Sequence, residues 1–328
     1  MLIMKTIPLL IAGITLLSSL APLQAAETPK KLLVVTVTGG YRHASIPTGE
    51  RIVEQLGKES GLYTVDYVRQ PEGKQPVAPK PVVLKSDATE AERATFKVAQ
   101  EKFAADMAVF EAAQPLWENQ LKAALVKLSP NSLKNYDGVV FISTTGDLPI
   151  PDREGFLAWI KSGKAFIGLH GASDTFHGWT EFAEMIGGEF DHHDAQLDVE
   201  CLNQDAKHPA TAHLPLTWPI PQEEVYQFKN YDASKVHELL IMDKKPSKNS
   251  RTPGHFPVAW CREYGKGKVF YTSLGHREDI WDADPNIKDR KNPVELSKAF
   301  QAHVLGGIEW ALGVKPGDGK PQPKQLTK

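Results

Sequence analysis

Short runs of consecutive apolar residues constrain the fold of this chain more than any other feature. They occupy residues 32–37, 139–143 and 165–169 and are rich in valine, isoleucine and phenylalanine. A run that is apolar without alternation is typical of a strand buried on both faces, as in a parallel sheet covered by helices. Residues 47–56 and 63–68 have the patterns of a helix and a second strand. This order predicts a βαβ opening and an α/β protein.

The pattern changes beyond Gly187, where several strand-like segments alternate between apolar and polar residues. Tyr264-Gly-Lys-Gly267 has the composition of a hairpin turn. A helical segment at 293–312 is followed by Gly313, a common helix stop. We therefore expect a three-layer α/β fold, a mostly parallel sheet with an antiparallel extension. The expected strands of that extension are 197–202, 225–228, 236–242, 257–262 and 268–273.

A single domain should span residues 31–313, because the strand and helix rhythm resumes after a helical insertion at about 87–128. We expect this insertion to be broken near Pro115, since proline disrupts a helix interior. Its aromatic residues at helical spacing, among them Phe96 and Phe103, are expected to pack against the sheet or a partner helix. The polar tail at 316–328 is expected to be disordered.

Residues 1–25 have the layout of a secretory signal peptide. Lys5 precedes an apolar run at 7–20, and small residues surround Ala25 and Ala26. The run is short for a membrane span, so cleavage is favoured over a retained anchor. We expect a periplasmic or secreted protein that has no membrane association after cleavage.

Net charge indicates the kind of partner, and cysteine content indicates whether a disulfide is needed. The formal charge is −2, without a basic field for nucleic acid, so the expected partner is a small molecule. Cys201 and Cys261 could form a disulfide after export, but two buried thiols are favoured because a core of this size needs no crosslink. Nothing in the sequence indicates an oligomeric state.

Polar clusters follow three of the expected buried strands. These clusters are Gly39-Gly-Tyr-Arg-His43, Thr144-Thr-Gly-Asp147 and Gly168-Leu-His-Gly-Ala-Ser-Asp174. Ligands of open parallel sheets bind at the carboxyl ends of the strands, so the three clusters could converge on one cleft. His170 also has the glycine spacing of a nucleophile elbow. An imidazole there suits a general base or a metal ligand better than an acyl nucleophile.

Several histidines could act as ligands of a metal ion. His43, His170, His193 and His276 lie beside glycine or at expected strand ends, although no H-E-x-x-H or Cys-His spacing is present. The cofactor is therefore unknown, with a divalent metal such as zinc possible and His193 a candidate ligand. Structural roles are expected for the other candidates: His177, His208, His213, His237, His255 and His303.

Six segments in order resemble the successive motifs of the ThuA-like (trehalose-utilisation) family, from about residue 31 to residue 313. They are Val34 to His43, Tyr136 to Asp147, Gly168 to Asp174, Gly187-Gly-Glu-Phe-Asp-His-His193, Glu224-Val-Tyr226 and Gly267 to His276. The resemblance implies a flavodoxin-like sheet, as in class I glutamine amidotransferases. His170 stands where those enzymes have their cysteine nucleophile, so glutamine amidotransferase activity is not implied.

The resemblance also implies that the exported chain acts on carbohydrate, as a keto-sugar or a disaccharide-derived glycoside. Proton transfer beside a carbonyl suits histidine, so His43 and His170, with Asp174, are the expected catalytic residues. Expected substrate-binding residues are Arg42, Thr145, Asp147, Glu224, Tyr226 and His276. Trp179 and Trp281 could stack on a sugar or pack in the core. A non-catalytic carbohydrate-binding protein and a metal-dependent hydrolase remain alternatives.

Overall fold

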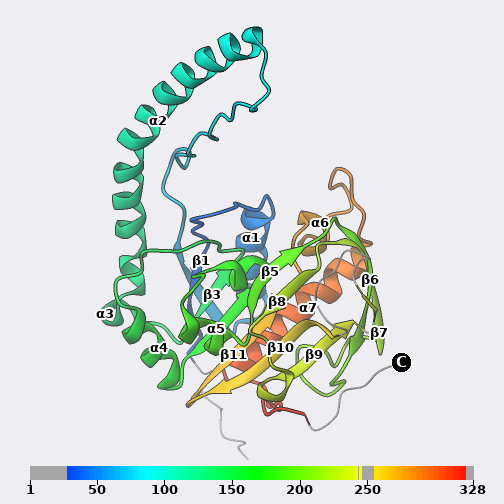
Figure 1. Ribbon diagram of the computed structural model, residues 1–328. Coiled ribbons are helices and arrows are strands. Elements are labelled where there is room, and N and C mark those ends of the chain that lie inside the picture. Colours follow the sequence, from blue (N-terminus) through cyan, green and yellow to red (C-terminus); the bar gives the residue numbers. More distant parts are fainter. Residues whose placement is uncertain (1–27, 243, 246–254, 323–328) are drawn as a thin grey trace, which may run out of the picture.

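The computed structural model describes residues 28–242, 244–245 and 255–322, so the expected signal peptide at 1–25 lies outside the described residues. The core of the molecule is one nine-stranded sheet, ordered β2-β1-β3-β4-β11-β10-β9-β6-β7 (Figure 1). None of the helices in the described ranges combines the length and apolarity that crossing a membrane requires.

Five adjacent strands form the parallel half of the sheet. They are β1 (Lys30–Val35), β2 (Tyr63–Val68), β3 (Gly138–Ile142), β4 (Ala165–Leu169) and β11 (Gly267–Thr272). Their order is that of a flavodoxin-like sheet, which confirms the expected fold class. Leu32 and Val34 belong to one core and Leu33 and Val35 to the other, all fully buried, as an uninterrupted apolar strand requires.

Antiparallel strands extend this sheet. They are β10 (Phe256–Tyr264), β9 (His237–Met242), β6 (Leu197–Asn203) and the edge strand β7 (Thr217–Glu223). β10 and β11 are joined by the predicted hairpin turn, in which Tyr264 pairs with Gly267. A separate two-stranded sheet pairs β5 (Glu189–His193) with β8 (Tyr226–Lys229).

Helices cover both faces of the sheet and complete three layers (Figure 1). α1 (Ile46–Ser60), α6 (Glu278–Trp281) and α7 (Val294–Ala311) lie on one face. The other face carries α4 (Arg153–Lys161), α5 (Thr180–Ile186) and the end of α2 (Glu90–Leu125). Short elements complete the chain: α3 (Pro130–Leu133) and the 3-10 turns η1 (Val126–Leu128), η2 (His170–Asp174) and η3 (Ala233–Lys235).

α2 corrects two expectations about the insertion. It is one helix of 36 residues that continues through Pro115, since this exposed position lets water satisfy the carbonyl that proline leaves unpaired. Most of the helix arches away from the sheet (Figure 1). Only Trp117, Leu121 and Leu125 are buried in the core, whereas Phe96 and Phe103 are half-buried and belong to neither core. The aromatic stripe therefore does not pack against the sheet.

The C-terminal segment is also more ordered than expected. Gly317 accepts a hydrogen bond from the Trp310 indole at 3.1 Å, and the carbonyl of Lys320 accepts one from His237 at 2.8 Å. Residues 316–322 are thus held against the domain, while 323–328 lie outside the described residues. The favoured state of the cysteines is confirmed, because Cys201 and Cys261 are both free and buried.

Candidate functional site

Four side chains come together at the carboxyl ends of the parallel strands. His170 directly follows β4, and His276 lies in the segment after β11. His43 lies between β1 and α1, and Glu224 lies between β7 and β8. Because β4 and β11 are adjacent parallel strands, residues following them meet although about a hundred residues separate them in sequence.

The backbone at His170 is tightly held. Its φ of 51° lies in the left-handed region, which residues other than glycine rarely adopt. The Tyr271 hydroxyl donates to the carbonyl of His170 at 2.8 Å, and that tyrosine is fully buried. The imidazole Nδ1 donates to the carbonyl of Ser273 at 2.7 Å. This tautomer leaves a lone pair on Nε2, which is buried and has no hydrogen-bond partner among the described residues.

One carboxylate oxygen stands at the centre of the histidines. Glu224 Oε2 lies 3.0 Å from His276 Nδ1, 3.5 Å from His170 Nε2 and 3.9 Å from His43 Nε2. One potential ligand atom from each of the four residues falls within 4.8 Å of every other. The rings of His43 and His170 meet edge to face, with centroids 4.6 Å apart, so the two predicted catalytic histidines lie together, although His170 is fully buried.

The protonation states in this group follow from burial and mutual repulsion. Burial, and then the neighbouring imidazoles of His170 and His276, lower the pKa of His43 to about 3. Burial alone would raise the pKa of Glu224, but its contacts with His170 and His276 hold that pKa well below its ordinary value. The site therefore offers a neutral imidazole at His43 and an ionised carboxylate at Glu224 near neutral pH.

This set of atoms fits a divalent metal ion. Imidazole nitrogens and a carboxylate oxygen are ligands that zinc and related transition metals accept. Tetrahedral ligands at zinc distances stand roughly 3.3 Å apart, and the separations of 3.0–3.9 Å from Glu224 bracket that value. The carbonyl bonded to His170 is the kind of partner that orients a metal-binding imidazole. His193, the residue predicted as a ligand, lies outside the four and contacts the other Glu224 oxygen at 3.1 Å.

A pocket of about 410 Å³ is lined by three of the four residues, His43, Glu224 and His276, whereas the fully buried His170 is not part of its lining. Tyr226 forms one wall, with its ring 4.6 Å from that of His170 and 4.3 Å from that of Phe190. Six of the residues expected from sequence to carry catalysis or binding line the pocket: His43, Asp174, His193, Glu224, Tyr226 and His276. Tyr41 and Phe190, which sequence reasoning missed, complete the lining.

Comparison with known proteins gives the context for this site. A family model described as "ThuA: Trehalose utilisation" matches residues 31–311. The chain belongs to the ThuA family. No curated protein gives a significant match.

Two solved structures support the fold assignment. A ThuA-like protein from Bacteroides uniformis is 17% identical, with 89% of this chain and 95% of that chain covered and a TM-score of 0.54. A ThuA-like protein from Parabacteroides merdae is 18% identical, with 90% and 96% covered and the same TM-score. At these identities the likeness shows a shared fold.

Three expected binding residues of this ThuA family member are engaged outside the pocket. The guanidinium of Arg42 donates to the carbonyl of Thr36 at 2.7 Å. Asp147 is exposed and pairs with Arg153. Thr145 donates to the carbonyl of Tyr41 at 2.8 Å, so it supports a pocket residue and does not face the pocket.

Sequence reasoning also missed a chain of hydrogen bonds behind Asp174. His177 Nε2 lies 2.5 Å from Asp174 Oδ1, and His177 Nδ1 lies 2.8 Å from Glu189 Oε1. Burial would lower the pKa of His177, but the two carboxylates raise it, while burial raises the pKa of Asp174. The spacing of Asp174 and His177 was visible in the sequence, but Glu189 joins them from the start of β5, a strand that the sequence did not predict.

The two tryptophans considered for sugar stacking are packing residues. Trp281 is fully buried and donates to the carbonyl of Gly275 at 2.8 Å. Trp179 is buried against Phe182, with ring centroids 5.5 Å apart. Neither lines the pocket over the histidines.

Proposed function

We propose that this ThuA family member is an exported, metal-dependent enzyme that acts on a carbohydrate bearing a carbonyl group, such as a keto-sugar or a disaccharide-derived glycoside. The observation that carries the proposal is the group of His43, His170, Glu224 and His276, whose potential ligand atoms all lie within 4.8 Å of one another. Export is supported by the composition of residues 1–25, with one lysine before an apolar run.

The pocket supports a sugar-sized ligand. Its volume of about 410 Å³ lies in the range of small-molecule sites. Tyr41 and Tyr226 offer ring surface, while Asp174 and His193 offer polar groups toward the same space. The family description, trehalose utilisation, agrees with a sugar as the ligand.

The residues divide naturally into two roles. A divalent ion held by the four would act as a Lewis acid that polarises a carbonyl or hydroxyl oxygen of the substrate. His43 is a poor base at neutral pH because its pKa is lowered to about 3. Asp174 is better placed to move a proton, since it lines the pocket and burial raises its pKa above the ordinary carboxyl value. His177 and Glu189 would orient its carboxyl group.

Turnover of a 3-keto-disaccharide before and after metal removal tests this function. We expect product formation with protein as purified, loss of at least 90% of the rate after chelation, and recovery when zinc or manganese is added back. Glu224→Gln should abolish the recovery because the amide is a weaker ligand, whereas His192→Ala should behave as the wild type because His192 is turned to Asp191. Turnover that is unaffected by chelation in metal-free protein would contradict the proposal. Sugar binding without turnover would favour a binding protein.

A further inference from the structure

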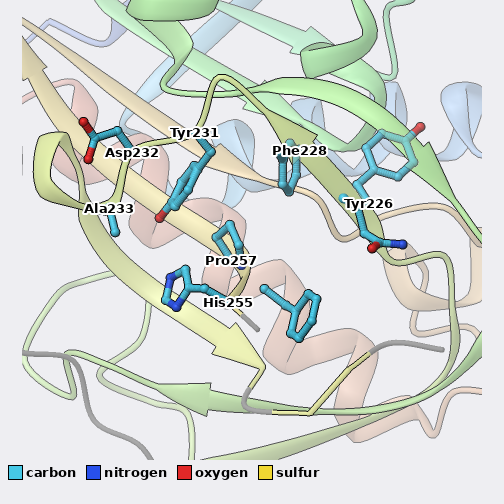
Figure 2. A pocket seen from close by; sticks show the side chains of 9 residues that line it. Tyr226, Phe228, Tyr231, Asp232, Ala233, His255 and Pro257 are labelled. Atoms are coloured by element: carbon cyan, nitrogen blue, oxygen red, sulfur yellow. The ribbon is translucent and has the colours of Figure 1, made fainter. Parts of the chain in front are cut away.

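A second pocket of about 360 Å³ shares the lining residue Tyr226 with the pocket over His43 and His276. Its walls come from β8, from the segment leading into η3 and from the start of β10. Figure 2 shows Asp232 and Tyr226 at opposite ends of the lining, with Tyr231, Phe228 and Pro257 between them. Tyr226 lines both pockets, so this groove is a direct neighbour of the candidate active site.

A buried carboxylate fixes the aromatic rings of the groove. Glu238 is 1% exposed, and its Oε1 accepts hydrogen bonds from the Tyr231 hydroxyl and from His255 Nε2, both at 2.5 Å. The rings of Tyr231 and His255 are nearly parallel, at 23°, with centroids 6.2 Å apart. Tyr231 also packs against the fully buried Trp260 at 5.0 Å. The ring surfaces are therefore held in place before any ligand arrives, which lowers the entropy cost of binding.

The charges around the groove are balanced. The hydrogen bond with Glu238 raises the pKa of His255, so a charge on this imidazole is matched by its buried partner. Asp232 faces Lys235 at 3.7 Å, and Lys235 lies outside the lining. Among the residues that the structure describes, those that line the groove include neither lysine nor arginine. A neutral ligand suits these described lining residues, which offer no lysine or arginine to pair with a phosphate or carboxylate.

Aromatic rings and a hydrogen-bond acceptor together suit a sugar ring. The C–H face of a pyranose can lie against the half-buried ring of Tyr231, and its hydroxyls can donate to the exposed Asp232 carboxylate. The volume is large enough for about one hexose with its first waters.

We propose that the groove is a second saccharide subsite, which binds a neutral pyranose unit next to the unit held over the histidines. The choice of a saccharide rests on the proposed function, but binding in the groove requires neither metal nor turnover. The enzyme would accordingly prefer substrates of two or more neutral sugar units over free monosaccharides.

Calorimetric titration of the full chain with trehalose and with glucose 6-phosphate tests the subsite. We expect trehalose to bind, Tyr231→Ala to raise its Kd at least fivefold, and glucose 6-phosphate to bind at least tenfold more weakly than trehalose. Tyr231→Phe keeps the ring and should retain binding, which separates loss of the platform from loss of folding when melting temperatures are compared. Asp232→Asn keeps the cap of η3 and should raise the Kd about threefold.

Tyr41→Ala is the comparison variant for the other pocket, because Tyr41 lines only the pocket over the histidines, and it too should weaken trehalose binding. Trehalose binding that depends on Tyr41 but not on Tyr231 would overturn the subsite, as would no measurable binding of trehalose or tighter binding of glucose 6-phosphate. Tighter binding of choline than of trehalose would also overturn it, since the rings would then serve a cation. A failed metal requirement in turnover would refute the proposed function and leave this titration unchanged.

Discussion

His170 combines a strained backbone with a place in the candidate metal site. A left-handed backbone at a residue other than glycine costs about 1–3 kcal/mol and tends to mark functional positions. Here the hydrogen bonds from Tyr271 to its carbonyl and from its own Nδ1 to Ser273 offset that cost. They also aim Nε2 at Glu224. The position of His170 could be predicted from its glycine spacing after an apolar strand, but the orientation of its ring depends on β11, which lies far along the sequence.

His177 gives a prediction about a single side chain. We expect His177→Ala to lower kcat by about tenfold to a hundredfold, because Asp174 would lose the partner that orients it. His177 lowers the pKa of Asp174 against the larger effect of burial, so its removal should shift the limb of the pH–rate profile governed by Asp174 to higher pH. Kinetics across pH, with metal content measured in parallel, check this. Metal content should stay at the wild-type level, and an unchanged profile and kcat would exclude the positioning role.

Among the elements, uninterrupted apolar strands could be predicted well and irregular ones could not. β1, β3 and β4 follow from their composition because burial on both faces leaves no polar position. β7 contains Pro219 and Pro221, which are tolerated because it is the edge strand, a fact that the sequence does not show. β5 was missed because its Asp191, His192 and His193 give it no apolar pattern.

The packing of helix α7 gives a prediction about a single element. Gly306 and Gly307 let the helix approach Pro209 and Phe270 so closely that an added Cβ would overlap both. Helix propensity alone favours Gly306→Ala by about 1 kcal/mol, but the overlap with backbone atoms should cost more. We expect Gly306→Ala to lower the melting temperature by about 3–10 °C, while Lys298→Ala on the exposed side of the helix should change it little. A rise in the melting temperature of Gly306→Ala would show that the contact with Pro209 leaves room for a Cβ atom.

The whole molecule brings the site together by strand order. β11 comes from the last third of the chain and inserts beside β4, which places His276 next to His170. The sequence motifs predicted that His43 and His170 would share an edge, because their strands belong to the opening parallel units. The places of Glu224 and His276 rested on family resemblance, since no spacing rule links them to that edge. The sequence also did not predict that α2 extends away from the sheet, because its aromatic spacing suggested packing against the sheet or a partner helix.

Buried histidines make the stability of the whole domain depend on pH. Burial lowers the pKa of His208 to about 4 and that of His303 to about 3, so the unfolded chain binds more protons than the folded one as pH falls below about 6.5. Stability should therefore decline from pH 6.5 downward. His177 and His255 have raised pKa values in the folded protein and act in the opposite direction. The stability that they contribute is fully present below pH 6.5 and is lost as the pH rises through their pKa values in the folded protein.

Urea unfolding at pH 7 and pH 5 checks this dependence. The midpoint should be lower at pH 5, and His303→Gln should reduce the difference between the two pH values because one buried imidazole is removed. Equal midpoints for the wild type at both pH values would contradict the assignment of neutral buried histidines.

The central claim is that His43, His170, Glu224 and His276 form one divalent-metal site, and calorimetric titration of zinc into chelator-treated protein tests it most directly. We predict one high-affinity site per chain in the wild type and in His192→Ala, and a loss of affinity of at least a hundredfold in His170→Ala and His276→Ala with the fold retained by circular dichroism. Unchanged zinc affinity in those two variants, or no binding by the folded wild type, would contradict the claim.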